Sequence, residues 1–513
     1  MNYKFQKEVI EAYEYLYDNN KLSLVYNLLN EMQDTFPFDK KPKHDKTIYP
    51  NIDYDLQIII KQYLYSELIT KDFNDQLLLA IVFSKKITHP LPKKWRDLLI
   101  QNSLNIDIFV SKKNFLSFVM KKFLNNFFKI LSVYKHKIFY NNCDYFPSNY
   151  IQLCDISAQS LPKSDYNIFN WLITNYNNNN HFDKIFHNLN VSDIFYNQIQ
   201  IASSKYYIKK NKKFSLFIWI IKGLVNAIIE LTKGNYYHLI LYYEAFLNVI
   251  FNKIQPSFLA NEYLFSISNF IYRPMWTYTA KKRGSQITLY GYASSFGGFK
   301  TKNSCEILEH EYNHTTWPKI LFWTKDYVNF IKSRVNDNII VENVEVPISF
   351  TDNGVSLPRF PEKTITIFDV SPVDDYHICR GLINMNYRNF RTSKLFLLDI
   401  YEVCQNYGYK IIWKRKRQFT HIHSKEYINF CNEFEKNDNV ITIDPDISAF
   451  RVILNSEIII SMPFTSTSFI AKYYGKKTFF YDPTSLLFKD DRGAQGITLV
   501  TGKSELYNYF KSL

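Results

Sequence analysis

The part of the sequence that most constrains the fold is the segment after residue 363, where short apolar runs alternate with longer amphipathic ones. Such alternation predicts parallel strands joined by crossover helices, because βαβ units repeat in this way. The expected strands are 364–370, 409–414, 439–444, 457–462 and 476–482, and the expected helices are 391–408, 425–435, 447–456 and 465–475. This pattern predicts a doubly wound, Rossmann-like domain.

The chain before this segment predicts a second α/β domain. From residue 214 onward, strands are expected at His238–Tyr243 and Ile287–Tyr292, and a helix is expected over Glu262–Thr279. Residues 1–135 have apolar residues at helical spacing, which predicts an additional helical region at the N-terminal end.

The domain boundaries follow from a stretch that contains three prolines and one glycine, residues 347–363, which is the expected linker. We therefore expect an α/β fold with two Rossmann-like domains. The N-terminal one spans 1–346 and includes the helical region, and the C-terminal one spans 364–513.

Composition and charge exclude several classes of protein. Hydrophobic residues make up 46% of the chain and aromatic residues 18%, which excludes a disordered protein. The net charge of +14 favours polyanionic partners. No RNA- or DNA-binding motif and no long Lys/Arg tract occurs, so nucleic acid is not an expected partner. A nucleotide-linked substrate or a membrane surface fits the charge better.

Several features predict a cytoplasmic protein, either soluble or peripheral at the inner face of the cytoplasmic membrane. The six cysteines form no C-x-x-C pair, which indicates a reducing compartment and no zinc site. The N-terminus lacks the apolar core of a signal peptide. The most apolar stretch begins at Phe214 but is interrupted by Lys222, Asn226 and Glu230, so we expect a buried helix there rather than a membrane anchor.

A turn rich in hydroxyl groups is the first candidate for ligand binding. It follows the expected strand 457–462 and opens the next helix. Helix N-termini at the carboxyl ends of such strands bind phosphate through free N–H groups. The candidate phosphate-binding residues are Ser461, Pro463, Phe464, Thr465, Ser466, Thr467 and Ser468. The alternative is that Thr465 or Ser466 only caps the helix.

Basic and acidic residues at neighbouring strand ends are further candidates. Lys414, Arg415, Lys416 and Arg417 follow one strand, and alternate members could face a cleft and neutralise a diphosphate, or all could be solvated. Asp444 precedes Pro445 and Asp446, and this loop could border the base or ribose, or Asp446 could cap a helix. Asp369 could face the cleft or simply end its strand.

The N-terminal domain offers fewer candidates. Glu244 is placed to start a helix and could act as a general base for an acceptor hydroxyl, although glutamate is common at helix starts for electrostatic reasons. His310 and His314 do not form a His-Glu-x-x-His pattern, and no Asp-x-Asp pair stands at a strand end, so no metal site is expected. The Gly- and Ser-rich run 291–299 could line the acceptor side of a cleft.

The run from Ser461 to Pro483, with Pro463-Phe464-Thr465-Ser466 at its start, resembles the polysaccharide biosynthesis PFTS-motif proteins. The resemblance extends over about residues 285–513. It implies a GT-B fold, in which two Rossmann-like domains face a cleft and the C-terminal domain binds the nucleotide.

The resemblance also implies a function. A glycosyltransferase of this kind would move a sugar from a nucleotide-sugar donor to a glycan or glycolipid acceptor during assembly of a bacterial capsule or O-antigen. The C-terminal pattern is more distantly similar to transferases that use CMP-linked acidic sugars, although this chain lacks their His-Pro after the basic strand. Neither a metal nor another cofactor is implied.

Two other functions share features of this sequence. Nucleotide-sugar 2-epimerases have the same fold and convert the donor without an acceptor. A non-catalytic basic scaffold at the membrane would bind anionic vesicles and no nucleotide.

Overall fold

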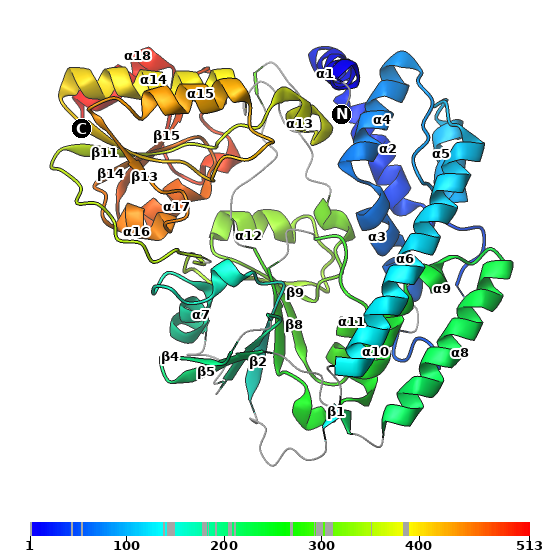
Figure 1. Cartoon of the computed structure of the whole chain (residues 1–513). Coiled ribbons are helices and arrows are strands. Elements are labelled where there is room, and N and C mark those ends of the chain that lie inside the picture. Colours follow the sequence, from blue (N-terminus) through cyan, green and yellow to red (C-terminus); the bar gives the residue numbers. More distant parts are fainter. Residues whose placement is uncertain are drawn as a thin grey trace.

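The computed structural model describes residues 3–42, 45–52, 55–136, 139–140, 149–176, 182, 184–189, 192–203, 208–209, 212–266, 270–291, 293, 301–302, 311–349, 351–382 and 389–513. It contains two parallel-sheet α/β domains and a large helical region (Figure 1). The expected fold class, two Rossmann-like domains with extra N-terminal helices, is therefore confirmed.

The C-terminal domain is built on a six-stranded, fully parallel sheet in the order β13-β12-β11-β14-β15-β16. Numbered along the chain, this is the 3-2-1-4-5-6 order of a Rossmann domain, with its reversal between β11 and β14. The strands are β11 (Thr364–Phe368), β12 (Lys410–Lys414), β13 (Val440–Ile443), β14 (Ile458–Ser461), β15 (Lys477–Asp482) and β16 (Leu499–Thr501).

Helices cover both faces of this sheet. In Figure 1, α14, α15 and α18 lie above it and α16 and α17 lie below it. The helices are α13 (Asp375–Arg380), α14 (Phe390–Tyr407), α15 (Lys425–Phe434), α16 (Ala449–Leu454), α17 (Ser466–Tyr473) and α18 (Lys503–Lys511). The sequence predicted the first five strands and the helices between them, but not β16, α13 and α18.

The N-terminal domain contains an eight-stranded sheet in the order β10-β9-β8-β7-β2-β3-β5-β4, in which only β4 is antiparallel. Its strand order reverses between β2 and β7, as in a Rossmann domain. The strands are β2 (Tyr150–Cys154), β3 (Lys184–His187), β4 (Ile194–Tyr196), β5 (Ile199–Ser203), β7 (Glu262–Phe265), β8 (Gln286–Tyr290), β9 (Lys319–Phe322) and β10 (Ile340–Asn343). A separate pair joins β1 (Phe139–Tyr140) to β6 (Ile208–Lys209).

Two predictions for this domain are wrong. His238–Tyr243 is helical rather than extended, and the first part of Glu262–Thr279 is a strand rather than a helix. In both segments nearly every side chain is buried, so the apolar residues show neither a helical nor an alternating period. The packing of neighbouring elements decides between the two structures.

The helical region lies on the right of Figure 1 and packs against the N-terminal sheet domain. Its helices are α1 (Tyr3–Asp18), α2 (Leu22–Asp34), α3 (Leu56–Leu68), α4 (Lys71–Phe83), α5 (Lys93–Gln101), α6 (Ile108–His136), α8 (Lys213–Thr232), α9 (Tyr237–Ile240) and α10 (Tyr242–Lys253), while α7 (Ile168–Trp171), α11 (Trp276–Lys282) and α12 (Lys325–Lys332) flank the sheet. We expected the stretch from Phe214 to be a buried helix. It is a helix, but most of it is not buried, since only 28% of its most apolar segment lies inside the protein.

Helix α13 links the helical region to the C-terminal domain. The Asp75 carboxylate on α4 accepts a hydrogen bond from the Tyr376 hydroxyl at 2.8 Å and pairs with the Arg380 guanidinium at 2.9 Å. The Tyr26 hydroxyl on α2 donates to the Leu382 carbonyl oxygen at 3.0 Å. Since α13 follows the loop after β11, these contacts connect the helical region to the point where the C-terminal sheet reverses its order.

Candidate active site

A pocket of about 580 Å³ lies at the carboxyl ends of β11, β12 and β14. This is the place where the strand order reverses and where open α/β sheets bind their ligands. Ala293, Ile348 and Thr351 close the pocket from the side of the N-terminal domain and the linker. The pocket brings together most of the residues predicted from the sequence, namely Asp369, Lys414, Arg415, Lys416, Phe464, Thr465, Ser466 and Thr467.

The turn before α17 leaves the start of that helix uncapped. Thr465 occupies the N-cap position, but its side chain makes no capping hydrogen bond and donates instead to the Met462 carbonyl oxygen at 2.8 Å. The hydroxyl of Thr467 is paired with that of Ser461 at 2.8 Å. The first N–H groups of α17 therefore receive no capping oxygen from Thr465, which is the arrangement that binds an anion. The simple capping alternative for Thr465 is not what the structure contains.

Phe464 holds this turn in an unusual conformation. Its φ of 60° lies in the left-handed region, which costs a bulky residue about 1–2 kcal/mol. Its buried ring packs on Phe480 with centroids 5.8 Å apart and touches Gly493, where an added Cβ would lie 2.8 Å from the ring. Strained residues of this kind concentrate at ligand-binding turns.

The two basic residues at the end of β12 have different surroundings. Lys414 is buried, and its ammonium donates to the Pro445 carbonyl oxygen at 2.9 Å. Burial lowers the pKa of Lys414 to about 8, although four nearby carboxylates oppose the shift. The guanidinium of Arg415 lies 4.1 Å from the centroid of the Phe419 ring, and its Nε and Nη1 atoms are buried without a hydrogen-bond partner in the described part of the chain. These two donors of Arg415 are therefore available to bind an external anion.

Asp369 has a supporting position at the bottom of the pocket. Its carboxylate accepts hydrogen bonds from the Tyr427 hydroxyl at 2.5 Å and from the Ser371 hydroxyl at 3.5 Å. Burial raises the pKa of Asp369, while hydrogen bonds and the charge of Arg415 oppose this shift. The carboxylate thus fixes the loop after β11 and adds negative charge beside Arg415.

Four predicted phosphate-site residues do not line the pocket: Ser461, Pro463, Ser468 and Asp444. Ser461 supports Thr467 from the end of β14, and Ser468 is buried and accepts a hydrogen bond from the Thr478 hydroxyl at 3.0 Å. The Asp444 carboxylate accepts hydrogen bonds from the Gln418 amide at 3.1 Å and from the Asp446 N–H at 2.8 Å.

Glu244 does not line this pocket either. It lies in the first turn of α10, where its carboxylate accepts the Met275 N–H at 3.0 Å and burial raises its pKa. Of the metal-like sequence Glu309–His314, residues 309 and 310 lie outside the described residues, as does most of the run 291–299. The described residues contain no group of three metal-binding side chains.

Sequence reasoning missed two residues that line this pocket and one acidic residue outside its lining, at a strand end of the N-terminal sheet. Ser371 and His423 line the pocket from loops that carry no recognisable motif. Asp155 directly follows β2, at the reversal point of the N-terminal sheet, with a φ of 58°. Its side chain is reached by solvent, yet the surrounding protein raises the pKa of its carboxyl group. The signal for Asp155 was an acidic residue at a strand end, but no strand was predicted over Tyr150–Cys154, so the signal was missed.

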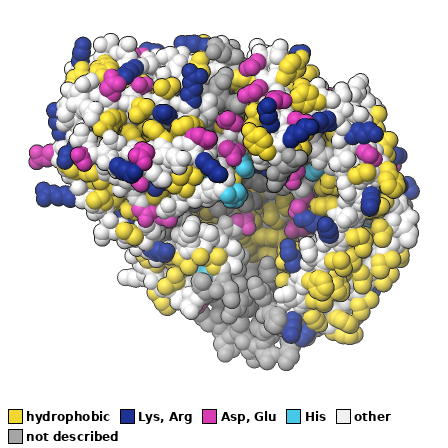
Figure 2. Space-filling view, turned by 45° about the horizontal axis from the view of Figure 1, so that its top comes forward, with side chains coloured by type: hydrophobic (Ala, Val, Ile, Leu, Met, Phe, Trp, Pro, Cys, Tyr) yellow, Lys and Arg dark blue, Asp and Glu magenta, His cyan; other side chains and the backbone are white. Residues whose placement is uncertain are grey.

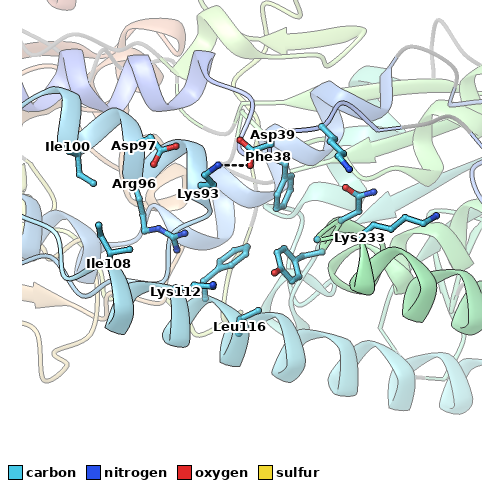
Figure 3. Close-up of a pocket in the computed structure, with 15 residues that line it drawn as sticks. Phe38, Asp39, Lys93, Arg96, Asp97, Ile100, Ile108, Lys112, Leu116 and Lys233 are labelled. Atoms are coloured by element: carbon cyan, nitrogen blue, oxygen red, sulfur yellow. Dashed lines mark hydrogen bonds and ion pairs between the residues drawn. The ribbon is translucent and has the colours of Figure 1, made fainter.

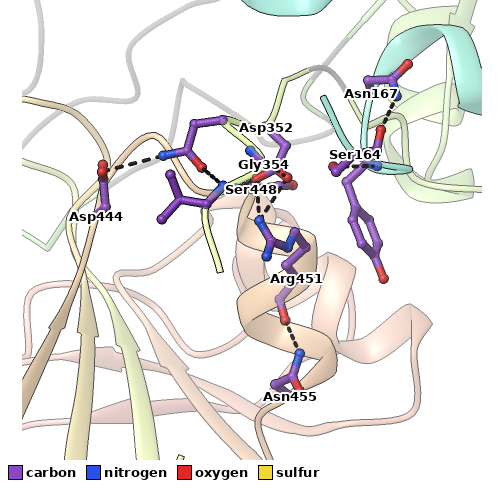
Figure 4. Close-up of polar contacts among 11 residues, drawn as sticks. Ser164, Asn167, Asp352, Gly354, Asp444, Ser448, Arg451 and Asn455 are labelled. Atoms are coloured by element: carbon purple, nitrogen blue, oxygen red, sulfur yellow. Dashed lines mark hydrogen bonds and ion pairs between the residues drawn. The ribbon is translucent and has the colours of Figure 1, made fainter. Parts of the chain in front are cut away.

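The linker is fixed to the C-terminal domain beside the pocket (Figure 4). The buried Asp352 carboxylate accepts the Ser448 N–H at 2.6 Å and pairs with the Arg451 guanidinium at 2.9 Å. Burial alone would raise the pKa of Asp352, but these hydrogen bonds and the charge of Arg451 outweigh it and lower the pKa. Since Ser448 lines the pocket, this contact sets the position of the linker relative to the pocket.

Solved structures with a similar course of the chain include UDP-GlcNAc 2-epimerase from Methanocaldococcus jannaschii, at 10% identity and a TM-score of 0.35, covering 71% of this chain and 91% of that one. A glycosyltransferase from Rickettsia africae matches at 11% identity and a TM-score of 0.33, covering 72% and 88%. The lipopolysaccharide outer core galactosyltransferase WaaB matches at 11% identity and a TM-score of 0.32, covering 70% and 89%. These likenesses are too weak to transfer a substrate or reaction.

None of the curated proteins matches this sequence. The family model for polysaccharide biosynthesis PFTS motif proteins matches residues 214–510, which include the β14–α17 turn and every strand of the C-terminal sheet. This match covers more than half of the chain and confirms the resemblance seen in the sequence. The chain belongs to the polysaccharide biosynthesis PFTS motif protein family.

Proposed function

We propose that this protein is a glycosyltransferase of the GT-B type that moves a sugar from a nucleotide-sugar donor to a growing surface polysaccharide. The observation that carries the proposal is the pocket at the β11–β14 reversal point, where Arg415 has two unpaired donors and α17 has an uncapped N-terminus. Both features stabilise a phosphate group. Membership of the family supports a role in polysaccharide assembly.

The reaction that suits this site is a single displacement. The acceptor oxygen would form a bond to the anomeric carbon while the bond from that carbon to the nucleotide phosphate breaks. Arg415 and the N-terminus of α17 would stabilise the charge that develops on the departing phosphate, which removes the need for a metal ion. One displacement inverts the configuration at the anomeric carbon.

Asp155 is a candidate general base for the acceptor hydroxyl. It stands at the carboxyl edge of the N-terminal sheet, and Ala293, three residues after β8 on the same edge, lines the pocket. Its raised pKa favours proton uptake in the transition state. Glu244, the candidate from sequence, is engaged by the Met275 N–H within the helical region. We therefore propose Asp155 rather than Glu244 as the base.

The test combines a panel of nucleotide sugars, CMP-linked acidic sugars among them, with fluorescently tagged oligosaccharide acceptors and mass-spectrometric detection of product. We expect Asp155→Asn to lower transfer by about 100-fold or more without changing nucleotide affinity, and Glu244→Gln to retain transfer. Conversion of a donor to its 2-epimer without acceptor would instead favour an epimerase. Product with retained configuration, seen by NMR, would rule out the single displacement.

A further inference from the structure

Helix α8 presents its apolar side chains to solvent. Its exposed residues recur at helical spacing along one stripe, and they are Phe214, Phe217, Ile218, Ile221, Val225, Ile228 and Ile229. The opposite side of the helix is also apolar and is buried. A helix with apolar side chains on two opposite sides is expected to be covered on both, and here the described protein covers only one.

Helix α6 carries a second exposed apolar stripe. Its members are Phe109, Met120, Leu124, Phe128 and Leu131, and the helix contains six lysines and no acidic residue. Helix α8 adds Lys213 and Lys222 and has one acidic residue, Glu230. We call the two stripes together the α6–α8 face. Large exposed apolar surfaces mark interaction sites, and this one has a strongly basic surround.

The two helices are antiparallel neighbours. At one end the rings of Tyr134 and Phe217 have centroids 6.4 Å apart, and at the other end Phe115 on α6 packs on Tyr236, just after α8, at 5.7 Å. Figure 1 shows both helices along the same side of the molecule. Figure 2 shows hydrophobic side chains gathered on that side with Lys and Arg among them.

A basic pocket of about 430 Å³ lies between the N-terminal part of α6 and the C-terminal end of α8 (Figure 3). Its charged lining is mostly basic: Lys40, Lys93, Arg96, Lys112 and Lys233 stand against Asp39, which is paired with Lys93, and Asp97. Arg96 is more than nine-tenths buried, donates to the Leu91 carbonyl oxygen at 2.9 Å, and forms no ion pair within the described part of the chain. Burial lowers the pKa of Arg96 although the charge of Asp97 opposes the shift, so an anionic ligand would stabilise the guanidinium further.

The packing of α8 favours a helix that lies on a membrane over one that crosses it. Its 20 residues would be long enough to span a bilayer. However, the Trp219 ring stacks on Tyr242 with centroids 5.9 Å apart, and a Cβ at Gly223 would lie 2.9 Å from the Tyr242 ring. The helix is therefore held closely against α10, while its other side remains free. Lysines beside a half-buried apolar helix are typical of attachment to anionic lipid.

We propose that the α6–α8 face docks on the surface of an anionic membrane, with its apolar stripes in the acyl-chain boundary and a lipid phosphate in the Arg96 pocket. The exposed apolar side chains would insert into the membrane, and the lysines would attract anionic headgroups. Such docking would hold the cleft close to lipid-linked glycans. The proposal does not depend on the identity of the sugar donor.

Flotation of the full-length protein with lipid vesicles tests this proposal. Vesicles of phosphatidylcholine alone are compared with vesicles in which about a third of the lipid is phosphatidylglycerol, a fraction chosen to give the surface a negative potential. We expect binding to the anionic vesicles, weakened about tenfold or more by Phe214→Ser with Phe217→Ser. The matched control is Ile194→Ser with Phe195→Ser on the edge strand β4. Its side chains are 37% and 74% exposed, against 72% and 46% for Phe214 and Phe217.

The pocket has its own variant. Lys112→Glu should weaken binding to the anionic vesicles, whereas Lys425→Glu, an exposed residue at the start of α15, should not. Equal binding of all variants, equal binding to both kinds of vesicle, or no binding to either would overturn the proposal. So would a dimer in light scattering that Phe214→Ser with Phe217→Ser converts to a monomer, because a second copy would then cover the face. None of these outcomes involves a nucleotide, so they leave the transferase proposal untouched.

Discussion

Replacing Arg415 with methionine should have opposite effects on stability and on binding. Arg415→Met keeps an unbranched side chain but removes the guanidinium that lies on the Phe419 ring, together with its charge and the buried Nε and Nη1 donors that lack partners. If these donors are held for a phosphate, the wild-type protein without nucleotide is less stable than it could be. The variant should therefore unfold at a higher temperature in the absence of ligand and respond less to its nucleotide.

Both magnitudes follow from the structure. An unsatisfied buried donor costs about 1–3 kcal/mol, and because the whole Arg415 side chain is only half-buried we take the lower end, about 1 kcal/mol of stability gained. For a chain of this size that is an increase in Tm of about 1–2 °C. Loss of a charged hydrogen bond to phosphate should weaken the Kd by about 10- to 100-fold.

Thermal unfolding with and without nucleotide measures both effects. At about 100 times the wild-type Kd, nucleotide should stabilise the wild type by about 2.7 kcal/mol, but a 30-fold weaker variant by only about 0.9 kcal/mol. Arg359→Met, an exposed linker position, is the matched control and should change neither value. A variant that is less stable without nucleotide and binds it with unchanged affinity would refute the reasoning, since Arg415 would then be a structural residue.

Three further variants test the framework of the site. Gly493→Ala should weaken nucleotide binding, measured by calorimetry, because the new Cβ would displace Phe464 and the turn that it holds. Asp352→Asn should lower the urea midpoint at pH 7. Since the folded pKa of Asp352 is lowered, its contribution is full above the unfolded pKa of about 4 and is lost as the pH falls through the folded pKa, so the two midpoints should move closer together as the pH is lowered to 3. If the midpoints stay equally far apart at pH 3, the carboxylate charge is not the cause. Asp75→Asn leaves the buried Arg380 paired only with the exposed Asp72 and should cost about 1–3 kcal/mol, seen as a lower Tm, whereas an unchanged Tm would mean that the α13 contact adds nothing.

The sequence by itself determined the C-terminal domain and most of its pocket. Its strands are short apolar runs separated by amphipathic helices, so the period of the pattern changes at each boundary and marks the elements. Parallel strands bring their carboxyl ends to one edge, and for that reason Arg415 and Thr465, 50 positions apart in sequence, could be placed together without a structure. The hydroxyl-rich turn at 461–468 was likewise visible in the residues.

The tertiary structure decided what the pattern left ambiguous. The segments 238–243 and 262–265 are buried on all sides, so only their neighbours determine that the first is helical and the second extended. Long-range contacts also determined which polar groups already have hydrogen-bond partners. Lys414 donates to the Pro445 carbonyl oxygen, whereas two donors of Arg415 have no partner in the described part of the chain. The sequence also did not predict that one side of α8 is exposed, because an apolar helix has the same sequence whether protein covers one side of it or both.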